Sequence, residues 1–217
     1  MDGSSTGLSR GLAVWEIASV LSSCLIAEWV VLAFVGRNRL ITAVPLVLVA
    51  GLMWVSHRER REGLYDIGIR TDNLLAACRL LLLPTAAAVL LIIASSWFMG
   101  YTRMGSLWRP RLITIPVWAL TQQYVLNGFI NRRAQLVFGK GLKSIVLVAV
   151  FFSLLHLPSP ILAVSTLAGG LIWAAVYQRQ PNLFAVTLSH SVISITIALT
   201  MRPSLLYNLR VGFKYFG

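Results

Sequence analysis

Polar side chains interrupt the apolar second half of the chain at three points. They are Gln122 with Gln123, His156, and His190 with Ser194. A neutral histidine can take up a proton, and two hydrogen-bond donors that meet at one point can stabilise an oxyanion. Gln123 and Asn127 are four residues apart, as are His190 and Ser194, so each pair shares one face of a helix. These residues are therefore candidates for a hydrolytic site or for a polar binding site.

Carboxylates are missing from this part of the chain, because no Asp or Glu follows Asp72. Polar groups inside a bilayer are costly, so a cluster of them indicates a functional site, but a site without an acid has limited proton-transfer chemistry. Glu28 lies in the middle of the first apolar run and needs a partner. Three roles stay open for it: a base brought to the site from another helix, an ion pair with Arg79, or a hydrogen bond to the glutamine pair. Glu16 is a weaker candidate for the same base.

The composition is that of a membrane protein. Hydrophobic residues make up 57% of the 217 residues and charged residues 12%, against about 25% charged in soluble domains. The net charge of +12 comes from Arg and Lys in short segments between apolar runs, including Arg60, Arg132 and Arg133. Such segments favour contact with anionic lipid headgroups over nucleic acid. We expect one membrane domain, residues 1–217, with the lipid bilayer as its partner and no nucleic-acid partner.

The apolar runs predict an all-α fold, a polytopic bundle of about seven transmembrane helices, because each approaches the ~20 residues that span a bilayer. The predicted helices are residues 12–35, 40–56, 74–99, 113–137, 142–157, 161–177 and 183–201. Residues 57–73 are predicted to lie at the membrane interface, and residues 202–217 form an amphipathic tail. The small residues Gly169 and Gly170 predict close contact with a neighbouring helix.

Structural explanations exist for each polar cluster. Amide side chains hold helices together in membranes, and a single membrane histidine often only satisfies a carbonyl. The cysteines, Cys24 and Cys78, have no metal-ligand spacing and predict neither a disulfide nor a redox role. Two histidines make a poor zinc site unless Glu28 joins them. We expect no metal and no cofactor.

The order and spacing of the clusters resemble the CPBP family, which contains the CAAX proteases and bacteriocin-processing enzymes. Its first motif, E-E-x-x-x-R-G, corresponds here to Gln122-Gln123-x-x-x-Asn127-Gly128. Its second, F-x-x-x-H, matches Phe152 to His156, and its third places a polar residue four positions after a histidine, as in His190 and Ser194. The resemblance covers residues 58–199 and implies a CAAX-protease-like core.

The resemblance also implies roles for these residues. In the family, a glutamate of the first motif and the histidine of the second are thought to activate water, and the third motif is thought to stabilise the oxyanion. Here the glutamates are glutamines, which keep the shape but cannot accept a proton near neutral pH. A general base typically accelerates a reaction by a factor of about 10²–10⁴, so we expect impaired peptidase chemistry.

Three functions follow as hypotheses. The first is a weakly active or non-catalytic protein that binds a membrane partner, a lipid or a peptide, including a prenylated one, with Asn127 and Phe152 contributing to substrate binding. The second is an active intramembrane endopeptidase that uses His156 and Glu28 as its base, with His190 and Ser194 as oxyanion donors. The third is a small transporter, or a subunit or assembly factor of a larger membrane complex. The expected location is a bacterial cytoplasmic membrane.

Overall fold

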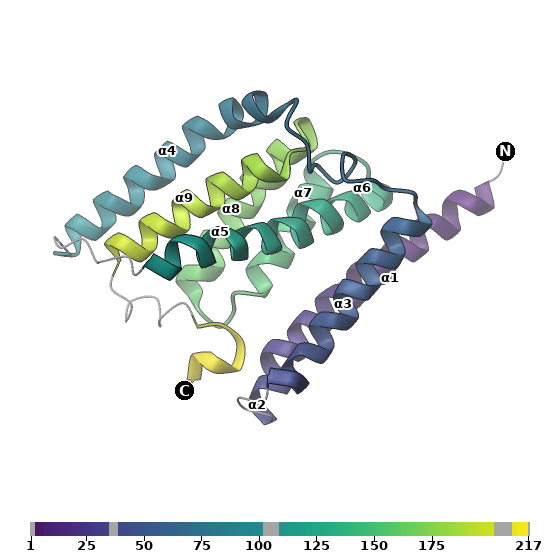
Figure 1. Cartoon of the computed structure of the whole chain (residues 1–217), viewed down its shortest axis with the longest axis horizontal. Helices are drawn as coiled ribbons and strands as arrows, with labels where there is room; N and C mark the ends of the chain where they lie inside the picture. The colour runs from purple at the N-terminus through teal and green to yellow at the C-terminus, as the bar shows by residue number, and fades with distance from the viewer. Residues whose placement is uncertain (1–2, 35–38, 102–108, 202–209, 217) are drawn as a thin grey trace.

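The fold is a helical bundle (Figure 1). The computed structural model describes residues 3–34, 39–101, 109–201 and 210–216, and all regular structure within them is helical. The elements are α1 (Gly3–Leu25), η1 (Ile26–Val31), α2 (Leu32–Phe34), α3 (Arg39–Glu59), α4 (Leu74–Phe98), α5 (Arg109–Gln123), η2 (Tyr124–Asn131), α6 (Arg132–Phe138), α7 (Leu142–Leu154), α8 (Pro160–Arg179), α9 (Leu183–Thr200) and η4 (Gly212–Phe216). The segments η1 and η2 are π-helical turns that continue one helix into the next, and η4 is a 3₁₀ helix. The predicted all-α fold is confirmed.

Local sequence explains where the helices end. Gly139, with φ of 78°, follows α6, and Pro160 is the first residue of α8. Asn182 caps α9 by accepting a hydrogen bond from the Ala185 amide at 2.9 Å. The helix α7 stops at Leu154, earlier than the sequence predicts, because two prolines follow within six residues and neither has an amide hydrogen. His156 therefore lies in the turn after α7 and not inside the helix.

Several of these helices can cross a bilayer by length and composition. They are Ser9–Val31, Leu74–Phe98, Pro160–Arg179 and Leu183–Thr200. Large apolar side chains also cover much of the outer surface; Leu82 and Leu83 in α4 are 70% and 78% exposed. A water-facing helix would not keep such a surface, whereas lipid tails accept it. The chain is an integral membrane protein.

Of the predicted amphipathic tail, residues 202–209 and 217 lie outside the described residues.

The helices form two groups (Figure 1). The antiparallel pair α1 and α3 lies beside a bundle made from α4 to α9, and α1 meets that bundle mainly at α6. Within the bundle, α7 packs against α8, while α4 and α5 both pack against α9. A Cβ atom on Gly170 would lie only 2.8 Å from the Cα of Ala149, so α7 and α8 meet backbone to backbone, as the small residues predict.

A buried ion cluster joins α1, the turn after α3, and α6. Arg133 is 0% exposed, and its guanidinium pairs with Glu16 at 3.0 Å and Glu62 at 2.8 Å. Arg60 also pairs with Glu16, at 3.2 Å, and Arg132 pairs with Glu62, at 2.6 Å. The prediction that these arginines contact lipid headgroups is wrong for Arg133, because the fold brings it against two carboxylates more than seventy residues away in sequence. The cluster fixes the α1–α3 pair to the bundle.

Glu62 makes the cluster sensitive to acid. Burial opposes ionisation of its carboxyl. Its neighbours outweigh burial and hold the pKa of Glu62 well below its usual range: His57 and Arg133 donate hydrogen bonds, Arg133 adds its charge, and Arg132 donates a further hydrogen bond. A lowered pKa stabilises the folded state above the unfolded carboxyl pKa, roughly 4.3, and this contribution is lost as the pH falls below that value.

We therefore expect the stability difference between wild type and Glu62→Gln to be largest above pH 5 and to shrink below about pH 4. Thermal unfolding of both proteins in detergent, followed by circular dichroism across this range, measures the difference. The exposed residue Glu59 provides the control, because Glu59→Gln should change the unfolding midpoint little at any pH. A difference for Glu62→Gln that is independent of pH would contradict the expectation.

Candidate functional site

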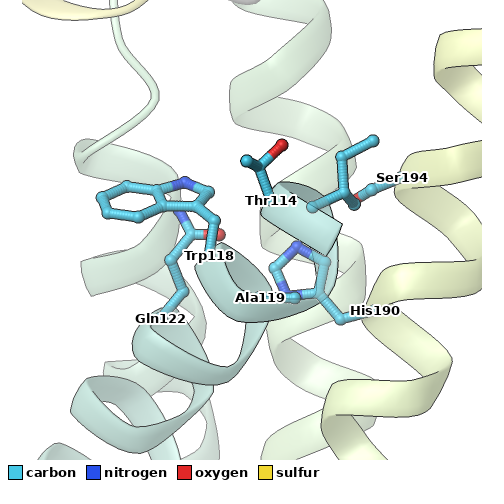
Figure 2. A pocket seen from close by; sticks show the side chains of 7 residues that line it. Thr114, Trp118, Ala119, Gln122, His190 and Ser194 are labelled. Carbon is cyan, nitrogen blue, oxygen red and sulfur yellow. The ribbon is translucent and has the colours of Figure 1, made fainter. Parts of the chain in front are cut away.

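A pocket of about 310 Å³ lies between α5 and α9 (Figure 2). Its lining residues are Thr114, Ile115, Trp118, Ala119, Gln122, His190 and Ser194. It brings together three residues that the sequence singles out: Gln122 from α5, and His190 with Ser194 from α9. Their side chains point into a space otherwise bounded by Trp118 and other largely apolar groups. The pocket can hold an apolar ligand with a few polar contacts, as small-molecule sites commonly do.

The glutamine pair divides between two environments. Gln122 lines the pocket, whereas Gln123 is 0% exposed and turned toward α9. Its Nε2 lies 3.2 Å from Nδ1 of His190, and its Oε1 accepts a hydrogen bond from Asn127 at 2.6 Å. Consecutive helical residues point about 100° apart, which explains the division. Gln123 therefore supports His190 from behind the pocket.

Further amides extend this contact away from the pocket. Asn131 donates to Oδ1 of Asn127 at 2.9 Å, and Gln178 donates to Oδ1 of Asn131 at 2.9 Å. The chain runs along η2, and π-helical turns of this kind are frequent at functional sites. Asn131 and Gln178 are missing from the sequence prediction. The spacing of Gln123, Asn127 and Asn131 at every fourth residue was the available signal for Asn131, but no signal linked Gln178 to them.

Aromatic residues fix the imidazole of His190. Trp173 from α8 stacks on it, with ring centroids 4.5 Å apart and planes at 26°. The indole nitrogen of Trp173 donates to Ser189 at 3.0 Å, and Ser189 shares a hydrogen bond with Thr85 of α4 at 2.7 Å. Phe152 meets the same imidazole edge to face at 5.8 Å. The ring is therefore held by three neighbouring helices, α4 indirectly and α7 and α8 directly.

His156 also contacts Phe152. The two rings meet at 4.7 Å, and Nδ1 of His156 donates to the carbonyl oxygen of Phe152 at 2.8 Å. Burial lowers the pKa of His156, although this hydrogen bond opposes the shift. The imidazole is consequently neutral near pH 7, with its lone pair on Nε2. Phe152 thus touches both histidines, but His156 does not line the pocket.

Glu28 has none of its expected partners among the described residues. No hydrogen bond joins its carboxylate to a histidine or to the glutamine pair, Oε2 is buried without a partner, and the side chain of Arg79 is exposed. The backbone of Glu28 instead packs against Gly212, whose amide donates to the Leu157 carbonyl at 2.8 Å. Glu28 therefore lies near the turn that holds His156 without bonding to the imidazole. Within the described ranges, no group of three His, Cys, Asp or Glu residues could hold a metal ion.

The part of the chain that contains this site is similar to a known protein family. Residues 105–196 match the family model described as "Type II CAAX prenyl endopeptidase Rce1-like". No curated protein and no solved structure matches the chain. The matched segment runs through α5 to α9 and includes both histidines, the glutamine pair and Ser194. The resemblance to CAAX proteases is therefore confirmed: residues 105–196 of this membrane protein are similar to the Rce1-like type II CAAX prenyl endopeptidases.

Proposed function

We propose that this CAAX-protease-like membrane protein binds a hydrophobic, prenylated membrane peptide and hydrolyses it weakly or not at all. The observation that carries the proposal is the environment of Gln123. Both ends of its amide are occupied, by His190 and by Asn127, and an amide cannot accept the proton of an attacking water. The likeness of residues 105–196 to CAAX prenyl endopeptidases supports the peptide as ligand. The compact segments between apolar runs in the sequence support a bacterial cytoplasmic membrane as the location.

The pocket supports binding through two kinds of contact. Ile115, Trp118 and Ala119 offer apolar surface to a hydrophobic chain. His190 and Ser194 offer polar atoms that can hydrogen-bond a peptide carbonyl, and Gln122 lies on the opposite wall. Because these groups need no charge change to bind a neutral peptide, the site can bind without supplying a base. Phe152 contributes by holding the imidazole of His190, and Asn127 by holding Gln123.

Binding and cleavage of one farnesylated peptide by the purified protein in nanodiscs test this proposal together. We expect wild type to bind the peptide without releasing a product detectable by mass spectrometry. His190→Ala should weaken binding by roughly two- to tenfold, the effect of one net hydrogen bond. Ser191→Ala is the matched control, since Ser191 lies on the same helix and its hydroxyl donates to the carbonyl of Thr187 within that helix. Equal binding by wild type and His190→Ala would contradict the proposal.

Restoring the family's acids should not restore hydrolysis. Gln122→Glu with Gln123→Glu returns two carboxylates, but Asn127 still stands where the family has an arginine. We expect this double variant to remain inactive on the same peptide. Cleavage by the double variant and not by wild type would show that the two glutamines alone silence the site.

An active endopeptidase is the second candidate, because one observation favours it. The lone pair on Nε2 of His156 makes this imidazole a base, and Glu28 lies near the same turn with a buried carboxylate oxygen that has no partner. If wild type cleaves the peptide and both His156→Ala and Glu28→Gln abolish cleavage, this candidate replaces the first.

A further inference from the structure

We propose that Asn127, Asn131 and Gln178 are positioning residues that fix which nitrogen of His190 carries the hydrogen. They form a one-directional chain of amide hydrogen bonds that ends at the pocket. The chain presents Nε2–H of His190 and so selects a ligand with a hydrogen-bond acceptor. This inference rests on the proposed function for the identity of the ligand, but the state of His190 can be measured without any ligand.

The direction of the chain is set by main-chain groups, which cannot exchange donor and acceptor. The amide of Gly141 can only donate, and it lies 2.9 Å from Oε1 of Gln178. Nε2 of Gln178 must therefore be the end that faces Asn131, and it donates to Oδ1 of Asn131 at 2.9 Å. The same nitrogen donates to the hydroxyl oxygen of Ser144 at 2.8 Å, which agrees with this orientation.

A second main-chain anchor confirms the orientation of Asn131. The carbonyl of Ala174 can only accept, and it lies 3.3 Å from Nδ2 of Asn131. Nδ2 also donates to Oδ1 of Asn127 at 2.9 Å, so Nδ2 of Asn127 must face Gln123. It does so at 2.6 Å from Oε1 of Gln123. Two independent anchors therefore impose one direction on three successive amides.

The contact between Gln123 and His190 determines which ring nitrogen of His190 carries the hydrogen. With its Oε1 committed to Asn127, Gln123 turns Nε2 toward Nδ1 of His190, at 3.2 Å. A hydrogen on Nδ1 would face the hydrogens of this amide, so Nδ1 must carry the lone pair. The hydrogen of the neutral imidazole is then on Nε2, the ring nitrogen away from Gln123. Figure 2 shows this imidazole beside Thr114 and Ala119, within the lining of the pocket.

This arrangement fits one chemical class of ligand. The donor on His190 needs an acceptor, and a peptide or ester carbonyl supplies one. A ligand with a hydrocarbon chain and no acceptor would leave a buried donor unpaired. The amide chain therefore favours an acylated or peptidic ligand over a bare hydrocarbon of the same length.

Nitrogen-15 NMR of the histidine side chains, in the full chain in detergent, tests the state of His190 directly. The chain has three histidines, so His57→Gln and His156→Gln variants assign the remaining signals. We expect the His190 signals of a neutral ring with hydrogen on Nε2. A ring with hydrogen on Nδ1 in wild type would overturn the proposal.

Two variants test the positioning role. Asn131→Leu removes the donor to Asn127, so the two amides nearer the pocket can turn and His190 should become a mixture of both neutral forms. Gln135→Leu is the matched control, because Gln135 also donates to Oδ1 of Asn131, at 3.0 Å, but lies outside the chain to His190. This control should retain the wild-type signals. Unchanged signals in folded Asn131→Leu would overturn the positioning role.

Gln123→Glu keeps the inference testable if Asn131→Leu does not fold. The carboxylate is nearly the same shape as the amide but can only accept, so His190 should acquire a hydrogen on Nδ1. A ring in the Gln123→Glu variant that keeps a lone pair on Nδ1 would contradict the inference.

Ligand binding separates this inference from the proposed function. A farnesylated cysteine ester should bind roughly two- to tenfold more tightly than an analogue whose carbonyls are reduced to methylene groups. If neither binds while the NMR result holds, the proposed function fails and the amide chain stands. If both bind equally, acceptor selection fails even where the positioning role holds.

Discussion

Replacing Arg133 with methionine should destabilise the protein by about 3–5 kcal/mol, the usual effect of breaking a buried ion pair from one side. Methionine keeps a flexible unbranched apolar stem and removes the charge, so the guanidinium and its ion pairs are the main loss. The carboxylates of Glu16 and Glu62 would remain buried, each with one arginine fewer. Arg60 and Arg132 still neutralise them in part, which favours the lower end of this range. Urea unfolding in mild detergent measures the change.

Arg58 provides the control for this substitution. It is exposed, and its guanidinium lies 5.1 Å from the ring centroid of Trp54, so Arg58→Met should cost no more than about 1 kcal/mol. If Arg133→Met is no more harmful than Arg58→Met, the ion cluster does not hold the α1–α3 pair to the bundle.

The second large effect is expected at Gly170, where α7 and α8 touch. Gly170→Ala places a methyl group 2.8 Å from the Cα of Ala149, which is backbone and cannot rotate away. The two helices must separate, and overpacking of this kind costs about 1–3 kcal/mol. Phe152 and Trp173 lie on these helices and hold His190, so the same variant should also bind the farnesylated peptide more weakly.

Gly51 is the matched glycine for comparison. It also lies inside a helix, α3, but a Cβ atom there would meet nothing within 4 Å. Gly51→Ala should therefore leave peptide binding unchanged and raise the free energy of unfolding by about 0.5–1 kcal/mol, because alanine favours a helix over glycine. Equal stability of Gly170→Ala and Gly51→Ala would contradict the close contact of α7 and α8.

Most of the helices could be predicted from the sequence, because they are apolar runs, several of which end at a glycine, a proline or a polar cap. The helix α1 begins at Gly3, earlier than the predicted residue 12, because its first turns are polar and carry no apolar signal. Gly139 and the Pro158–Pro160 pair end α6 and α7 close to the expected places. The π-helical segment η2 could not be predicted, since its residues have no local pattern that distinguishes a wide turn from an ordinary one. The segment η2 begins directly after Gln123, the residue that contacts His190 of α9.

The sequence by itself determined the class of protein, the positions of the helices and the residue types of the site. Regular spacing also placed Gln123 with Asn127, and His190 with Ser194, because neighbours four apart on a helix share a face whatever surrounds them. Only the tertiary structure decided the partners that come from elsewhere. The pairing of Arg133 with Glu16 and Glu62 and the link from Gln178 to Asn131 depend on how separate helices pack. So does the finding that Glu28 makes no hydrogen bond to the glutamine pair. Such contacts join residues tens of positions apart, and no local pattern carries that information.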